Sequence, residues 1–224
     1  MDRENNGVRE NAFFDASSEA KIRNAFEQLN GEVSMHAILL PDCKYSNRLK
    51  DFLDELSDIT DKIPINISLK GEDLDVEDKI ETNLFPVIAL INKDGEYTRI
   101  CYHGPPGGHE LESFISAVDI IAGKELNISE PLLGRIKKLQ VPINLKPGVS
   151  SKCVRCPMLV QSCQSLAIIN TGISSEMVDL SYFPDIVKKF RIMSVPALII
   201  NDEKVKFGEK NLEELVTELE EYSK

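Results

Sequence analysis

Residues 152–163, KCVRCPMLVQSC, hold three of the five cysteines of this 224-residue chain. Cys153 and Cys156 form a C-x-x-C motif between an apolar strand candidate and an apolar helical pattern. The first sulfur is therefore expected at a helix N-terminus, where N–H groups and the helix dipole lower a thiol pKa below its free value of about 8.5. The second sulfur follows one turn later. The motif predicts that Cys153 attacks a disulfide and that Cys156 resolves the mixed disulfide.

The same two cysteines could instead supply part of a zinc site, which needs about four ligands. The chain has no second C-x-x-C and no H-x(3–5)-H pattern, and all of its histidines lie in the first half. Zinc ligands would have to be scattered along the sequence, so no metal site is predicted. Cys163, two turns beyond Cys156, is expected to be a small buried residue facing the sheet, and Cys101, in an apolar strand candidate, has the same interpretation.

The order of elements around the motif is repeated in the first half. Pro196 follows Cys153 by 43 positions, and Pro86 follows Cys43 by the same 43. In both halves the cysteine follows a strand candidate and the proline opens an apolar strand that ends in asparagine. Each half has the order strand, helix, strand, helix, strand, strand, helix, which predicts an α/β protein built from two copies of one unit.

Hydrophobic periodicity and breaker residues locate these elements. Helices are expected near residues 16–29, 41–56, 75–82, 111–123, 130–138, 153–169, 182–190 and 211–222. Strands are expected near residues 33–40, 64–69, 85–92, 96–103, 141–145, 174–180, 195–201 and 204–209. Asn211 is expected to cap the last helix.

Charge and hydropathy restrict the classes of partner. The chain has 26 Lys and Arg against 37 Asp and Glu, a formal net charge of -11, which repels nucleic acid and anionic membranes. No apolar run approaches the roughly 18 residues of a membrane span, and the start MDRENNGVRENAFFD lacks the apolar centre of a signal peptide. We therefore predict a cytoplasmic protein without nucleic-acid or membrane partners.

This order of elements resembles the thioredoxin fold. The tandem arrangement is similar, more narrowly, to glutaredoxin-like protein disulfide oxidoreductases and to the N-terminal domain of the alkyl hydroperoxide reductase flavoprotein subunit. Both families show a G-x-P-x-G-H-E stretch, matched here by GPPGGHE at residues 104–110. After a polar leader over residues 1–15, the resemblance implies two fused thioredoxin-like units, 16–126 and 127–224. Each unit would have a central mixed β-sheet flanked by helices.

The resemblance also implies roles for residues outside the motif. In the thioredoxin fold the proline matched by Pro196 is typically cis and faces the cysteine pair. The residue before it, here Val195, offers backbone groups to an extended substrate, and we add Arg155 to this expected substrate site. Within GPPGGHE, Glu110 and its neighbour His109 are expected only to begin a helix.

The first unit departs from the pattern of the oxidoreductases. It reads CKYS at residues 43–46, with Ser46 where a resolving cysteine would stand. A single thiol forms a mixed disulfide but cannot complete an intramolecular exchange. Unit one is therefore predicted to be redox-inactive or a monothiol site, with Cys43 as a possible secondary thiol.

The predicted function is that of a thiol–disulfide oxidoreductase that passes electrons from a thioredoxin reductase-like flavoprotein to disulfide substrates such as a peroxiredoxin. The chain lacks a G-x-G-x-x-G fingerprint, so it is expected to bind no cofactor, with flavin and NAD(P)H on the partner reductase. One alternative is a protein disulfide oxidase or isomerase that uses the same dithiol. Another is a non-catalytic thioredoxin-fold binding module, in which the two cysteines hold zinc between chains.

Overall fold

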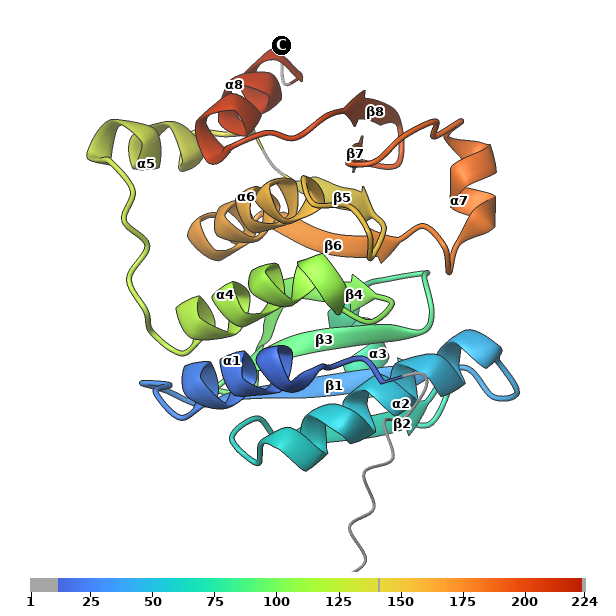
Figure 1. The fold of residues 1–224 in the computed structure, drawn as a ribbon. Coiled ribbons are helices and arrows are strands. Elements are labelled where there is room, and N and C mark those ends of the chain that lie inside the picture. The colour runs from blue at the N-terminus through green and yellow to red at the C-terminus, as the bar shows by residue number, and fades with distance from the viewer. Residues whose placement is uncertain (1–11, 141, 223–224) are drawn as a thin grey trace, which may run out of the picture.

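The computed structural model describes residues 12–140 and 142–222, and Figure 1 shows their fold. The helices are α1 (Ala16–Phe26), α2 (Lys44–Ile59), α3 (Leu74–Ile80), α4 (Leu111–Ile121), α5 (Glu130–Ile136), α6 (Cys156–Ile169), α7 (Pro184–Lys189) and α8 (Leu212–Tyr222), with a 3-10 turn η1 (Gly108–Glu110). The strands are β1 (Val33–Leu39), β2 (Ile65–Leu69), β3 (Val87–Asn92), β4 (Tyr97–His103), β5 (Ile143–Val149), β6 (Ile173–Asp179), β7 (Ala197–Ile200) and β8 (Lys204–Phe207). The predicted mixed α/β class is confirmed.

The strands form one sheet in the order β2-β1-β3-β4-β6-β5-β7-β8. The first four come from the first half of the chain and the last four from the second. Parallel pairing of β4 with β6 joins the two sets, with Ile100 opposite Ser175 and His103 opposite Val178. The sequence predicted a mixed sheet in each unit, and the structure adds that the two sheets are continuous. The unit boundaries at residues 15 and 126 remain predictions.

Helices cover the two faces of the sheet unequally. Helices α1, α2, α4 and α6 pack on one face, together with α5 and α8 (Figure 1). On the opposite face lie the shorter helices α3 and α7. Ile80 of α3 packs with Ile38 there, and Ile186 of α7 packs with Ile199. This second face is therefore covered by two short helices, one from each half of the chain.

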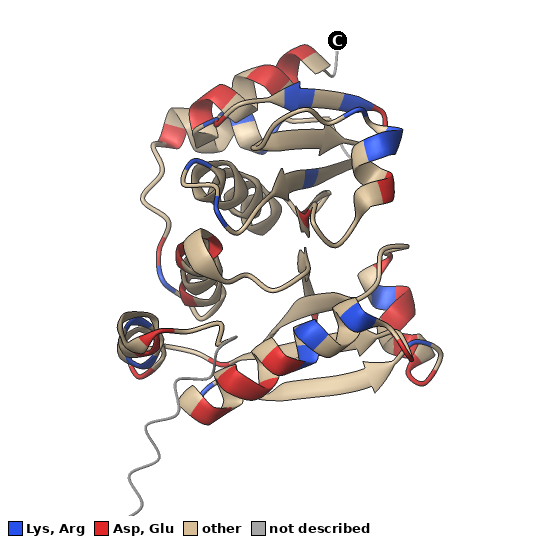
Figure 2. Cartoon of the chain, turned by 45° about the vertical axis from the view of Figure 1, so that its right-hand side comes forward, with Lys and Arg blue, Asp and Glu red and all other residues tan. Residues whose placement is uncertain are grey.

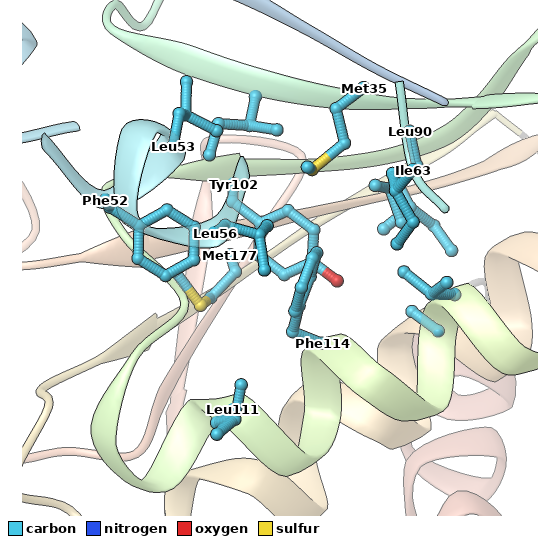
Figure 3. Close-up of a cluster of buried hydrophobic side chains, with 14 of the residues drawn as sticks. Met35, Phe52, Leu53, Leu56, Ile63, Leu90, Tyr102, Leu111, Phe114 and Met177 are labelled. Carbon is cyan, nitrogen blue, oxygen red and sulfur yellow. The ribbon is translucent and has the colours of Figure 1, made fainter. Parts of the chain in front are cut away.

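The core on the well-covered face spans both halves of the chain. Figure 3 shows Tyr102 of β4 and Phe114 of α4 in one cluster with Met177 of β6. The rings of Tyr102 and Phe114 are 5.7 Å apart at their centroids, and Gln164 of α6 donates a hydrogen bond of 2.9 Å to the Tyr102 hydroxyl. Since residues of both halves fill the same apolar volume, packing as well as strand pairing holds the halves together.

Two predicted boundaries in the second half differ from the structure. Strand β5 continues through Pro147 to Val149, beyond the predicted end at residue 145. Proline lacks an N–H, and the β5–β6 pairing skips from Leu145 to Gly148, which accommodates it. The predicted first residue of this strand, 141, lies outside the described residues. Helix α6 begins at Cys156 rather than at Cys153, which lies in the preceding turn.

Charged side chains gather on the last helix and the strand beside it. Figure 2 shows acidic residues along α8 and basic residues on β8. Glu218 of α8 contacts Lys206 at 2.6 Å and Lys210 at 3.0 Å. The glutamate-rich stretch of α8 thus lies on the outer face of an amphipathic helix, and part of its charge is paired. No helix within the described ranges is both long enough and apolar enough to cross a membrane.

The N-terminus of α8 provides a stability prediction. The Glu214 N–H donates to Asn211 Oδ1 and the Asn211 N–H donates to Glu214 Oε2, each at 2.9 Å, so the predicted cap is confirmed as a reciprocal capping box. We expect Asn211→Ala to lower the free energy of unfolding by about 1 kcal/mol, measured by urea denaturation. The control is Asn47→Ala at an exposed position inside α2, where alanine favours the helix. Equal effects of the two substitutions would contradict this role.

Candidate functional site

Cys153 and Cys156 form a disulfide between the carboxyl end of β5 and the start of α6, with their Cα atoms 5.5 Å apart. The two cysteines differ in burial. Cys156 is 0% exposed, whereas Cys153 is half-buried at the surface of the same apolar cluster. A protein substrate can therefore reach the sulfur of Cys153 but not that of Cys156.

The surface around the disulfide combines apolar and basic side chains. Val154 and Met158, which lie close to the two cysteines in sequence, are exposed. Lys152 and Arg155 are exposed in the turn that leads into α6. Exposed apolar side chains in one region are typical of a protein-binding surface.

The structure brings the predicted substrate residues to different places. The Val195–Pro196 peptide bond is cis, as the resemblance implied. Val195 is half-buried and packs against the cluster that contains Cys156, the cluster on which Cys153 also lies. Pro196 is buried, whereas the Arg155 side chain is exposed just before α6. The role of these three residues in substrate binding remains a prediction.

The GPPGGHE stretch of the first half packs against the loop that carries the disulfide. Gly108 begins η1 with a φ of +60°, and a Cβ added there would lie 2.8 Å from the carbonyl oxygen of Ser151. A side chain at this position would collide with backbone, so glycine permits the close approach. The stretch therefore places the next residues of the first half beside the cysteines of the second.

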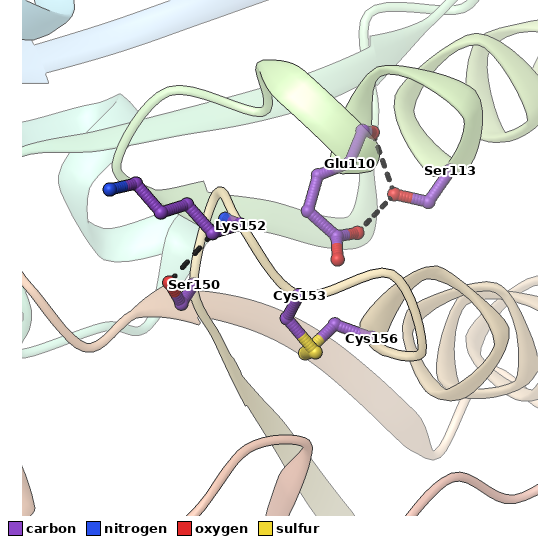
Figure 4. The surroundings of a disulfide bond; sticks show 6 residues. All are labelled: Glu110, Ser113, Ser150, Lys152, Cys153 and Cys156. Atoms are coloured by element: carbon purple, nitrogen blue, oxygen red, sulfur yellow. Dashed lines mark hydrogen bonds between the residues drawn. A yellow bond between two sulfur atoms is a disulfide. The ribbon is translucent and has the colours of Figure 1, made fainter.

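Glu110 is the residue that this contact brings to the disulfide. It is 1% exposed, and Ser113 donates a hydrogen bond of 2.6 Å to its Oε2. Burial raises the pKa of Glu110 to about 7; the Ser113 hydrogen bond opposes this shift and the charge of Asp179 adds to it. Its Oε1 has no hydrogen-bond partner within residues 12–140 and 142–222. In Figure 4 this oxygen points toward Cys153 and Cys156.

The sequence prediction gave Glu110 only a place at a helix start and missed its position beside the cysteines. One signal in the sequence could have indicated its burial. Glu110 precedes Phe114 by four positions and Ala117 by seven, so helical periodicity places it on the apolar face. A carboxylate on that face needs an explanation, because burying a charge is costly.

The corresponding site of the first half keeps several features of an active site. Cys43 is half-buried directly before α2, and the Phe85–Pro86 bond is cis. Burial alone would raise the pKa of Cys43, but hydrogen bonds from the Ser46 and Tyr45 backbone and from the Ser46 hydroxyl, with the charge of Lys44, lower it overall. Cys43 as a secondary thiol remains a prediction.

Two further cysteines are fully buried and free. Cys163 lies among apolar side chains of the second half, as predicted. Cys101 is also buried, but the purely apolar interpretation of this residue was incomplete. Its Sγ lies 3.6 Å from the Nε2 of His103. Burial raises the pKa of both cysteine thiols, so neither is a ready nucleophile.

Comparisons with known proteins identify the fold and relatives. Residues 143–221 match the family model of a thioredoxin domain. The NTD_N/C domain of the alkyl hydroperoxide reductase AhpF from Enterococcus faecalis is 32% identical, with a TM-score of 0.85 over 92% of this chain and 99% of that one. A protein disulfide oxidoreductase from Aeropyrum pernix, 18% identical, covers 93% of each chain with a TM-score of 0.82, which shows the fold alone.

A longer relative is the alkyl hydroperoxide reductase AhpF of Staphylococcus aureus, 28% identical over 205 residues. The match covers 91% of this chain but 37% of the relative, so the chain spans about a third of the length of that curated protein. These findings confirm the predicted thioredoxin-like fold and the resemblance on which it was based. The Cys153–Cys156 pair is accordingly a redox-active disulfide.

Proposed function

This chain belongs to the family of the NTD_N/C domain of alkyl hydroperoxide reductase AhpF and is a thiol–disulfide oxidoreductase; from that premise we propose that it passes electrons from a thioredoxin reductase-like flavoprotein to a disulfide substrate such as a peroxiredoxin. The observation that carries the proposal is the unequal burial of the cysteine pair beside a buried carboxyl group. An exposed attacking sulfur, a protected resolving sulfur and a nearby base suit disulfide exchange.

In the first step the Cys153 thiolate attacks one sulfur of the substrate disulfide. A bond forms between Cys153 and that sulfur, while the other substrate sulfur leaves as a thiolate. Cys153 acts here because it is the accessible member of the pair. Lys152, Arg155 and the N-terminus of α6 stabilise its negative charge.

In the second step Cys156 attacks Cys153 and releases the reduced substrate. The Cys153–Cys156 disulfide forms as the mixed disulfide breaks, so two electrons have passed to the substrate. A fully buried Cys156 thiol must first lose its proton, and water cannot reach it readily. We propose that the carboxylate of Glu110 accepts this proton, because a pKa of about 7 suits a general base near neutral pH.

The cycle closes when a flavoprotein returns two electrons to the disulfide. Flavin and NAD(P)H would bind to that reductase. Val195, Pro196 and Arg155 are proposed to hold the substrate chain against Cys153. The chemistry requires a compartment that keeps a reductant available, and we propose the cytoplasm.

A reconstituted electron-transfer assay tests this function. The mixture contains NAD(P)H, a thioredoxin reductase-type flavoprotein, an oxidised peroxiredoxin and a hydroperoxide. We expect NAD(P)H consumption to depend on this chain and to rise with its concentration. Reduction by the flavoprotein should also convert the Cys153–Cys156 disulfide into two titratable thiols.

The alternative, an oxidase or isomerase, makes a different prediction about the reduction potential. Dithiol potentials extend from about -270 mV in reducing proteins to about -120 mV in strong oxidants. Equilibration with glutathione measures this value. A potential near the oxidising end, together with no reduction by the flavoprotein, would contradict the proposed direction of electron flow.

A further inference from the structure

A second group of reactive side chains lies away from the disulfide, where the two halves join. Cys101 and His103 alternate along β4 and point to the same face of the sheet. Glu176 stands opposite Cys101 in the parallel β4–β6 pairing, so its side chain projects on that face as well. Figure 1 shows these two strands side by side in the middle of the sheet. The register therefore brings together residues that are far apart in the sequence.

These side chains are close to one another and buried. The Nε2 of His103 lies 3.0 Å from the Oε2 of Glu176 and 3.6 Å from the Sγ of Cys101. One potential ligand atom from each residue, a sulfur, a nitrogen and an oxygen, lies within 4.8 Å of the other two. A thiol, an imidazole and a carboxylate are together the ligand types of protein zinc sites.

We propose that Cys101, His103 and Glu176 bind a zinc ion that bridges the two halves of the sheet. Zinc–ligand bonds of about 2.0–2.3 Å at tetrahedral angles separate neighbouring ligand atoms by roughly 3.4–3.6 Å. The sulfur–nitrogen distance of 3.6 Å already fits this geometry. The nitrogen–oxygen distance of 3.0 Å has to widen by a few tenths of an ångström, and the sulfur–oxygen distance, which is within 4.8 Å, has to come to the same range, so side-chain rotations must accompany binding.

The surroundings of Glu176 support its orientation toward a metal. Its Oε1 accepts a hydrogen bond from the Asn144 side chain and lies 3.7 Å from the Nζ of Lys146. Its Oε2 faces His103 at 3.0 Å and also accepts a hydrogen bond of 3.2 Å from the Thr82 hydroxyl. Hydrogen bonds to the second carboxylate oxygen are typical outer-shell contacts of metal ligands. The positive charge of Lys146 would repel a bound cation. The carboxylate of Asp202, which lies 3.0 Å from the Lys146 Nζ, offsets this positive charge.

His103 has incomplete hydrogen bonding for a buried histidine. The ring is 0% exposed and is covered by the edge-on ring of Phe183, at a centroid distance of 5.9 Å. Its Nδ1 has no hydrogen-bond partner among the residues that the structure describes. The Nε2 is the nitrogen directed at Cys101 and Glu176, the side on which a metal would bind.

A cavity of about 750 Å³ borders this cluster at Glu176. It lies between α3 and α7, on the face of the sheet that these short helices cover, and Glu176, Thr82 and Tyr97 are among its lining residues. Zinc entering by this route would take a water molecule from the cavity as its fourth ligand. The Cys101 thiol proton passes to solvent when the zinc–sulfur bond forms. The bound ion would link β4 to β6 and so stabilise the junction of the halves.

Cobalt(II) and zinc(II) titrations of the oxidised 224-residue chain test this proposal. With Cys153 and Cys156 held in their disulfide, we expect about one equivalent of cobalt to bind and to give a thiolate-to-cobalt absorption band, which zinc then removes. Cys101→Ser should abolish the band, and Glu176→Gln should weaken binding at least about tenfold. The matched controls Cys163→Ala and Cys43→Ser should retain it.

X-ray absorption of the zinc-loaded wild-type chain gives a reading that does not depend on the folding of any variant. One sulfur and two or three nitrogen or oxygen ligands are expected. The proposal is overturned if the wild-type chain binds no metal, if the band survives in Cys101→Ser, or if zinc has two or more sulfur ligands. If Cys101→Ser does not fold, the number of sulfur ligands around zinc in the wild-type protein decides whether the proposed site is correct.

Discussion

Cys153→Ser is expected to reduce the rate of disulfide reduction to that of the reaction without the protein. Cys153 is the accessible sulfur of the pair, while Cys156 is fully buried and cannot receive a protein substrate. A serine hydroxyl in place of the thiolate neither attacks a disulfide nor forms the mixed intermediate. The measurement is the reduction of a peroxiredoxin disulfide, followed through NAD(P)H consumption in the reconstituted assay.

Cys156→Ser should have a different effect on the same reaction. The first attack remains possible, but nothing resolves the intermediate, so a covalent complex with the substrate should accumulate. A non-reducing gel detects this complex, and a thiol reductant should release it. Cys163→Ala is the matched control, because Cys163 is a free, fully buried cysteine on the same helix. A covalent complex from Cys153→Ser but not from Cys156→Ser would reverse the assigned roles.

Local patterns predicted most of the elements and the cysteine pair. The C-x-x-C motif and the cap at Asn211 each depend on residues close together in sequence, whereas the cis bond before Pro196 was expected from the resemblance. Predictions from local sequence patterns were wrong where contacts between distant segments determine the structure. The strand was expected to end at residue 145, and only the β5–β6 pairing shows how Pro147 is accommodated within a longer strand.

Contacts between the halves could not be predicted in this way. The pairing of Cys101 with Glu176 depends on the register of β4 against β6, strands that are separated along the chain by α4, α5, β5 and α6. A search for zinc ligands by sequence spacing therefore found none. The position of Glu110 beside the disulfide likewise depends on Gly108 packing against Ser151. The sequence contains these residues, but strand register and loop packing bring them together.

Glu110→Gln is expected to slow the release of the reduced substrate about 10²-fold at pH 8. Glutamine keeps the size of the side chain and can still hydrogen-bond Ser113, but it cannot accept the proton of Cys156. In the wild-type protein the resolution rate should rise with pH through about 7, as the Glu110 carboxyl group loses its proton. The variant should lack this rise. Stopped-flow breakdown of the preformed Cys153 mixed disulfide measures the step directly.

The same substitution should raise stability, which separates a proton-transfer role from a merely structural one. Burial, with the charge of Asp179, raises the pKa of Glu110 from 4.5 to about 7 against the Ser113 hydrogen bond, so the folded state favours the protonated form. The stability that the protonated Glu110 carboxyl group contributes to the folded state is fully present below pH 4.5, and it is lost as pH rises through about 7. At pH 8 the wild-type protein then carries a buried charge that costs about 3 kcal/mol, and Glu110→Gln should be more stable by up to that amount.

Glu112→Gln is the matched control for both measurements. Glu112 lies two residues further along, and its ion pair with Lys21 is exposed, so its removal should change neither the pH profile nor the stability appreciably. Glu110→Gln should therefore differ from it by a slower reaction and a higher stability at alkaline pH. A slower reaction with an unchanged rise near pH 7, or a loss of stability at pH 8, would show that Glu110 positions the cysteines without moving a proton.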